Sequence, residues 1–269
     1  MNCTFLSDID GTLLKTNSPM PEATIDAAQA FVDAKGYLAL CTGREIRSAG
    51  SIVQLLPVNA PCILYGGGMI YDFKEQKILW MQPLDNSILV VMDTILQCEP
   101  SVSITVLTVA GIHTIRMNGF MSEHGVFEDR TAPQCMISEL KGDILKVLLT
   151  CDDPEILEGL RGRIIDPDVF EYSFAALHFY EITPKGVDKG TSMIKLEELM
   201  HLPDNHFFVS GDAGTDLTMR KNAVLFFAPE TAEEIVRRSA DYIIPGPSDA
   251  GMVHAFTRAV AYMHNKSIR

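Results

Sequence analysis

The sequence has little positive charge for its length and no long apolar run. Its 269 residues include 22 Lys and Arg against 35 Asp and Glu, which gives a formal net charge of −13. A field of this sign repels a polyanion, so we expect no nucleic-acid partner. No stretch of about 18 apolar residues occurs, and the chain does not open with a basic segment followed by an apolar one. We therefore expect no membrane partner and a cytoplasmic location.

The six cysteines also lack the spacing of a disulfide framework or a metal site. They form no Cys-x-x-Cys pair, and four lie in apolar, strand-like runs, where a thiol usually serves as a small hydrophobe. The seven histidines are scattered, without a His-x-x-x-His spacing. Metal chemistry based on Cys or His is therefore not expected.

Both ends of the chain alternate short apolar runs with amphipathic stretches. We expect strands at residues 4–6, 37–41, 62–65, 206–209, 224–227 and 242–244, and helices at 21–35, 188–200, 231–239 and 250–264. Strands separated by helices indicate βαβ units and a parallel sheet. Residues 1–82 and 185–269 are thus predicted to form a doubly wound, Rossmann-like α/β core.

The middle of the chain, residues 83–184, follows a different pattern. A helix at 85–98 precedes strands at 103–109 and 113–117, which are expected to form a hairpin that turns at Ala110-Gly111. Segments at 144–151, 154–160 and 169–174 add further strands and a helix. This block predicts an inserted α+β cap domain.

The first of four motifs, Asp-Ile-Asp-Gly-Thr-Leu-Leu at residues 8–14, directly follows a strand. Open α/β sheets bind ligands at the carboxyl ends of their strands. Asp8 can attack phosphorus, and Asp10 can protonate the leaving oxygen. Gly11 permits a turn close to an anion. An isolated Asp-x-Asp would be read as a solvated turn, but the full string favours the catalytic interpretation.

The second motif, Thr42-Gly43-Arg44, also follows a strand. Thr42 offers a hydroxyl donor, Gly43 lets its N–H approach a phosphate, and the helix that starts nearby would add its positive end. Arg44 is a candidate substrate ligand, with a surface arginine at a helix start as the alternative.

The third motif supplies a lysine, which is needed to screen the nucleophile from the phosphate because both are anionic. Lys185 and Lys189 compete for this role. Lys189 is the better candidate because it opens a predicted helix, and Lys185 is then a solvated loop residue.

The fourth motif is Gly-Asp-Ala-Gly-Thr-Asp at residues 211–216. Mg²⁺ prefers oxygen ligands and needs only one or two carboxylates beside substrate oxygens and water, so Asp212 next to Asp8 would suffice. Asp216 has three interpretations: a further ligand through water, a partner that positions Lys189, or an acidic residue at a helix N-terminus.

In this order the four motifs resemble those of the haloacid dehalogenase-like phosphatase superfamily. The insertion resembles the large, C2-type cap of the Cof-like sugar phosphatases. The resemblance implies Mg²⁺-dependent hydrolysis of a small phosphate monoester, such as a sugar phosphate or a similar phosphometabolite, through an aspartyl-phosphate. It implies Asp8 as nucleophile, Asp10 as general acid/base, Mg²⁺ held by Asp8, the Asp10 carbonyl and Asp212, and phosphoryl binding by Thr42 and Lys189.

Two positions depart from the family pattern, since Thr215 and Gly66 stand where Asn is usual. Thr215 keeps a hydroxyl donor and is a candidate phosphate ligand, with a helix N-cap as the alternative. His113, His178 and Glu181 in the presumed cap could face the substrate, but core or surface roles are expected.

Two other functions are compatible with the same motifs. One is a phosphomutase of the same superfamily, and the other is a non-catalytic phosphosugar-binding protein. The binding protein is disfavoured because every charged catalytic position is intact. We expect a monomer or a small homo-oligomer.

Overall fold

A computed structural model describes residues 2–15, 18–124, 131–202 and 204–267. The chain divides into two compact units. Met1–Trp80 together with Asp188–Arg269 form what we call the core unit, and Met81–Val187 form the cap unit.

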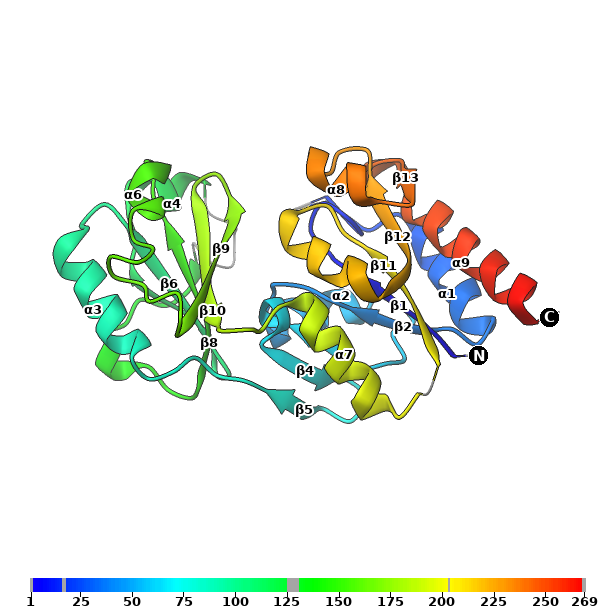
Figure 1. Cartoon of the computed structure of the whole chain (residues 1–269), viewed down its shortest axis with the longest axis horizontal. Coiled ribbons are helices and arrows are strands. Elements are labelled where there is room, and N and C mark those ends of the chain that lie inside the picture. Colours follow the sequence, from blue (N-terminus) through cyan, green and yellow to red (C-terminus); the bar gives the residue numbers. More distant parts are fainter. Residues whose placement is uncertain (1, 16–17, 125–130, 203, 268–269) are drawn as a thin grey trace. The chain divides into compact units, whose positions relative to one another are not determined.

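The core unit is built on a five-stranded sheet in the order β13-β12-β11-β1-β2 (Figure 1). All four pairings in this sheet are parallel. Its strands are β1 (Asn2–Ser7), β2 (Tyr37–Leu40), β11 (Asn205–Ser210), β12 (Ala223–Pro229) and β13 (Tyr242–Ile244). The prediction of a Rossmann-like α/β core is therefore confirmed.

Both faces of this sheet are covered, as parallel sheets require. Neighbouring residues on β1, Phe5 and Leu6, point to opposite faces, and both are fully buried. On one face the Phe5 ring lies 5.8 Å from that of Phe31 and 4.7 Å from that of Phe256. These two rings come from α1 (Glu22–Asp33) and α9 (Met252–Ser267), which lie side by side in Figure 1. The remaining helices of the core unit are α2 (Ile46–Val53), α7 (Lys189–Met200) and α8 (Glu234–Ser239), with 3-10 helices η1 (Tyr65–Gly67), η3 (Gly214–Asn222) and η4 (Pro247–Asp249).

The strand expected at residues 62–65 is present, but its assignment to the parallel sheet is wrong. It is β3 (Cys62–Leu64), which pairs antiparallel with β4 (Met69–Asp72) in a separate three-stranded sheet completed by β5 (Lys77–Met81). A single parallel bridge, Cys41 to Ile63, connects β3 with the end of β2. The run after Tyr65 contains three glycines, so the chain turns back at once and β3 takes a hairpin partner instead of a helix.

The cap unit contains a five-stranded antiparallel sheet in the order β7-β6-β8-β10-β9. Its strands are β6 (Ser103–Thr108), β7 (Gly111–Arg116), β8 (Ile144–Thr150), β9 (Phe170–Ala176) and β10 (Phe179–Pro184); its helices are α3 (Ile88–Cys98), α4 (Gly119–His124), α6 (Pro154–Glu158) and the 3-10 helix η2 (Ile137–Glu139). The predicted hairpin at Ala110-Gly111 is confirmed, since β6 and β7 pair antiparallel there. Strand β10 was not predicted. Among the described residues, no helix is long and apolar enough to cross a membrane.

The three cap residues singled out from the sequence have contacts inside the cap unit. Glu181 pairs with Lys146 at 2.6 Å, between β10 and β8. The His178 ring lies 4.6 Å from that of Phe120, and its Nδ1 is 3.1 Å from the carbonyl oxygen of Cys151. His113 lies opposite Val106 on the hairpin.

Candidate active site

The loop after β1 is held by its apolar residues, which leaves its two acids at the end of the strand. Ile9, Leu13 and Leu14 are all buried. The backbone N–H groups of Leu13 and Leu14 both donate to the carbonyl of Ile9, at 2.9 and 3.1 Å. The leucines of the motif thus close a tight turn around Ile9, and Asp8 continues the strand by donating its N–H to Ser210 O on β11 at 3.0 Å.

Lys189 lies between two buried carboxylates. Its Nζ donates to Asp8 Oδ1 at 2.7 Å and to Asp216 Oδ1 at 2.6 Å. The side chains of Asp8, Lys189 and Asp216 are only 10%, 5% and 1% exposed. The structure therefore brings Lys189 to Asp8, whereas Lys185 belongs to the cap unit and pairs with Glu171 at 3.3 Å.

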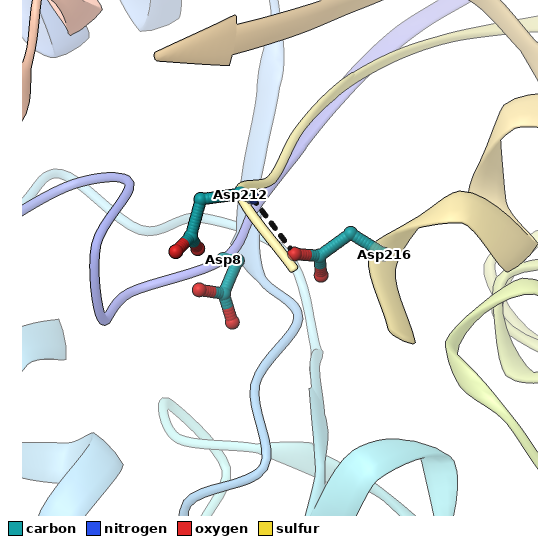
Figure 2. Close-up of side chains that lie close together, drawn as sticks. All are labelled: Asp8, Asp212 and Asp216. Carbon is teal, nitrogen blue, oxygen red and sulfur yellow. Dashed lines mark hydrogen bonds between the residues drawn. The ribbon is translucent and has the colours of Figure 1, made fainter. Parts of the chain in front are cut away.

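Asp216 has both carboxylate oxygens engaged. Oδ1 accepts from Lys189, and Oδ2 accepts from the backbone N–H groups of Asp212 at 2.9 Å and Ala213 at 3.1 Å. Figure 2 shows this carboxylate directed at the backbone of Asp212. Of the three interpretations from the sequence, the geometry agrees with a residue that fixes Lys189 and the turn that carries Asp212.

Asp212 approaches the Asp8 loop closely because of Gly11. A Cβ atom on Gly11 would lie 2.2 Å from Asp212 Oδ2, and the residue has φ +79°, which favours glycine. Thr12 Oγ1 donates to Asp212 Oδ1 at 3.0 Å. No role was predicted for Thr12 from the sequence, although it lies within the first motif. Its hydroxyl, a possible donor to a nearby carboxylate, is the feature that could have indicated this contact.

Burial and crowding of acids shape the electrostatics of this cluster. Burial raises the pKa of Asp8 well above its usual range, and Asp216 and Asp212 add to the shift while Lys189 opposes it. Burial and the Asp216 charge raise the pKa of Asp212 to about 6. Burial disfavours the Lys189 ammonium, but Asp216 and Asp8 outweigh it and hold the pKa of Lys189 well above its usual range. The cluster thus has three carboxyl groups and only one lysine to offset their negative charge.

The donor set suits a magnesium ion. Carboxylate oxygens of Asp8, Asp212 and Asp216 lie within 4.8 Å of one another, all from core-unit segments (Figure 2). These are the hard oxygen ligands that Mg²⁺ prefers, and a cation would relieve the crowding that raises the pKa values of Asp8 and Asp212. Because the oxygens of Asp216 are already hydrogen-bonded, Asp8 and Asp212 are the carboxylates that fit a direct role.

The Thr42 loop follows β2, and its hydroxyl is buried. Thr42 Oγ1 accepts the N–H of Arg44 at 3.2 Å, which keeps the hydroxyl hydrogen for another acceptor. Gly43 lies between them. The prediction that the positive end of the following helix would serve a phosphate is wrong for α2, because the buried carboxylate of Glu45 already accepts from the N–H groups of Arg47 and Ser48 at 2.7 and 2.6 Å.

Arg44, a candidate substrate ligand from the sequence, contacts Asp10 in the structure. Its Nε donates to Asp10 Oδ2 and its Nη2 to Asp10 Oδ1, both at 2.7 Å. Thr215 lies in the first turn of η3, where its carbonyl accepts from Thr218 Oγ1 at 3.0 Å. The N-cap of η3 is Ala213, so the alternative interpretation of Thr215 as a helix N-cap is wrong. Thr215 follows Asp212 within the same motif, so both stand at the end of β11.

The glycine run at residues 66–68, in which the sequence singled out only Gly66, joins the Thr42 loop to the start of α7. Gly66 N–H donates to Thr42 O at 3.0 Å, and Gly67 O accepts from Ser192 Oγ on α7 at 2.6 Å. A Cβ on Gly67, whose φ is +119°, would lie 2.5 Å from the backbone of Asp188, next to Lys189. The Gly-Gly-Gly run was the signal, since such a run permits close backbone contacts.

Comparisons with known proteins show the family of the chain. The 5-amino-6-(5-phospho-D-ribitylamino)uracil phosphatase YitU of Bacillus subtilis is 22% identical over 224 residues, 79% of this chain and 80% of that protein. The crystal structure of TM0651 from Thermotoga maritima has a TM-score of 0.79 at 25% identity, covering 96% of this chain and 97% of that one. The subclass IIB sugar phosphatase BT4131 has a TM-score of 0.80 at 19% identity, with coverage of 96% and 98%. The family model for haloacid dehalogenase-like hydrolases matches residues 5–256. The chain therefore belongs to the haloacid dehalogenase-like hydrolase family, as the order of its motifs predicts.

Proposed function

We propose that this protein is a Mg²⁺-dependent phosphatase that hydrolyses a small phosphate monoester through a phosphorylated Asp8. The observation that carries the proposal is the cluster at the ends of β1 and β11, in which Lys189 screens Asp8 and Asp212 approaches the same loop across Gly11. A carboxylate nucleophile can meet a phosphate dianion only where positive charge offsets their repulsion.

The proposed reaction has two steps. The Asp8 carboxylate attacks phosphorus, the ester P–O bond breaks, and Asp10 gives its proton to the leaving alkoxide. Water then attacks the aspartyl-phosphate and gives a proton to Asp10, and the bond between phosphorus and Asp8 breaks to release phosphate. Lys189 and Thr42 bind the phosphoryl oxygens. When bound, Mg²⁺ would be held by Asp8, Asp212 and the Asp10 carbonyl, and would supply positive charge that stabilises the transferring phosphoryl group.

The substrate class proposed is a sugar phosphate or a similar phosphorylated metabolite, selected by the cap unit. The similar proteins support this choice, since YitU is named for a phosphoribityl compound and BT4131 is a sugar phosphatase. Residues 83–184 are the predicted cap, and their α+β structure differs from that of the core unit.

The test is phosphate release by the purified full chain. We expect hydrolysis of p-nitrophenyl phosphate with Mg²⁺, loss of activity in EDTA, and recovery when Mg²⁺ is restored. A panel of phosphorylated sugars and other phosphometabolites then identifies the substrate. Full activity in chelator would reject the metal, and isomer formation without phosphate release would favour the mutase.

A further inference from the structure

We propose that Arg44 is a positioning residue, which holds Asp10 as the base for the second step, and does not bind the substrate. The proposal rests on the phosphatase function above. Two charge-assisted hydrogen bonds of 2.7 Å join the guanidinium to both carboxylate oxygens of Asp10. Such a bidentate pair fixes the plane and direction of a carboxylate, which a single contact does not.

Arg44 is itself fixed on three sides. Its Nη1 donates to Ser48 Oγ on the next turn at 3.2 Å. Its backbone N–H donates to Thr42 Oγ1, and its carbonyl accepts from Tyr65 N at 3.0 Å. The guanidinium side chain is 19% exposed and that of Asp10 is 41% exposed. A half-buried arginine with several anchoring contacts therefore supports a carboxylate that remains open to solvent, from which an attacking water can come.

The choice of p-nitrophenyl phosphate as substrate separates the two steps that Asp10 could serve. Both oxygens of Asp10 accept N–H groups of Arg44, so the position of each oxygen that could take a proton from water is fixed. In the second step, water attacks phosphorus, its proton goes to Asp10, and Asp8 leaves as a carboxylate. The first step with p-nitrophenyl phosphate needs little help from an acid, because nitrophenolate leaves readily. Arg44 should therefore affect dephosphorylation of Asp8 more than its phosphorylation.

The experiment compares Arg44→Gln, Arg44→Lys and the control Arg47→Gln on p-nitrophenyl phosphate with Mg²⁺. We expect kcat of Arg44→Gln to fall about 10- to 100-fold, the scale of a misplaced catalytic group. The KM should fall with it, kcat/KM should stay near wild type, and a burst of nitrophenol should precede the steady state. Arg44→Lys should recover only part of kcat, because lysine cannot form the bidentate pair. Arg47 is exposed and its side chain should not matter.

A double variant and an inhibitor separate the outcomes. Asp10→Asn combined with Arg44→Gln should be no slower than Asp10→Asn alone, and inhibition by inorganic phosphate should be unchanged in Arg44→Gln. A raised KM with weaker phosphate inhibition, or additive losses in the double variant, would show that Arg44 binds the substrate and would overturn this role while the phosphatase function stands. If Arg44→Gln does not fold, the same readouts on Arg44→Lys decide. A wild-type protein without turnover would instead reject the proposed function, and this inference with it.

Discussion

The two units each bury a lysine against carboxylates, but with different balances of charge. In the core unit, Lys189 contacts Asp8 and Asp216, and the carboxylate of Asp212 lies within 4.8 Å of both acids. In the cap unit, Lys146 pairs with Glu181 at 2.6 Å, with side chains 7% and 15% exposed. One cluster has an excess of acid, and the other is a one-to-one pair.

The difference indicates what each arrangement is for. A one-to-one buried pair is complete without a ligand, and loss of either partner leaves a charge that neither water nor protein compensates. In the core cluster, the raised pKa values of Asp8 and Asp212 mean that their ionised forms destabilise the free protein. A bound cation would stabilise these ionised forms. We therefore expect acid removal to have opposite effects on stability in the two units.

The largest effect is expected at Asp8, the proposed nucleophile. Asp8→Asn should lower kcat by at least about 10⁴-fold, the scale on which loss of a nucleophile acts. The fold should remain, because asparagine keeps the shape and removes a charge that burial disfavours. Steady-state turnover of p-nitrophenyl phosphate and the circular dichroism spectrum measure the two effects. Near-normal kcat in this variant would exclude a covalent mechanism on Asp8.

Thr215 is the next position by expected size. If its hydroxyl donates to the phosphoryl group, Thr215→Val should lower kcat about 10²- to 10³-fold, and Thr215→Asn should keep most of the activity. If Thr215 only supports the first turn of η3, whose N-cap is Ala213, Thr215→Val should instead leave kcat unchanged and lower only the stability. Kinetics and thermal unfolding of both variants separate the roles, and Thr215→Val with wild-type kcat and a lower Tm would reject the phosphate contact.

More of the strands of the core unit than of the cap unit could be predicted from the sequence, for physical reasons. Buried parallel strands such as 206–209 and 224–227 are short apolar runs between helices, so periodicity and spacing reveal them. Strand β10 ends at Pro184 and includes Glu181, whose burial depends on Lys146, 35 residues earlier in the chain. A partner so far along the chain is not visible in a local pattern.

The candidate active site was also predictable only in part. Motif order predicted which acids stand at the strand ends, because parallel strands deliver their carboxyl ends to one edge. It also favoured Lys189, the first residue of α7, over Lys185. It did not predict that Arg44 would hold Asp10 or that Glu45 would cap α2, because both depend on where a side chain turns. The contact of Thr12 with Asp212 joins residues 200 positions apart.

In the cap unit, the balanced pair should respond to the loss of either partner. Glu181→Gln or Lys146→Met should each lower the free energy of unfolding by about 3 kcal/mol, because the remaining charge stays buried. The double variant Lys146→Met with Glu181→Leu should recover to within about 1 kcal/mol of wild type, since well-packed apolar side chains can replace a buried pair. Urea unfolding of the full chain gives the values. Equal and additive losses would mean that the two side chains do not act as a pair.

In the core unit, the smallest predicted effect is a change of stability with pH at Asp212. Its pKa is raised from 3.8 to about 6, so the folded protein keeps a proton that the unfolded chain releases. The metal-free protein should therefore lose stability as pH rises from about 4 to about 6, and the loss should be complete at neutral pH.

The variant Asp212→Asn tests this dependence. In EDTA at pH 7.5 it should raise the Tm by a few degrees, since about 1 kcal/mol corresponds to roughly 2–4 °C in a chain of this size. At pH 4 its Tm should match that of wild type. Mg²⁺ should raise the Tm of wild type at pH 7.5 but hardly at pH 5, where protons compete for the same oxygens, and it should do little for Asp212→Asn at either pH. Asp93→Asn, at an exposed acid on α3, is the matched control. A lower Tm for Asp212→Asn in EDTA at pH 7.5 would mean that the core cluster resembles the cap pair, with its acids held for stability and not for a cation.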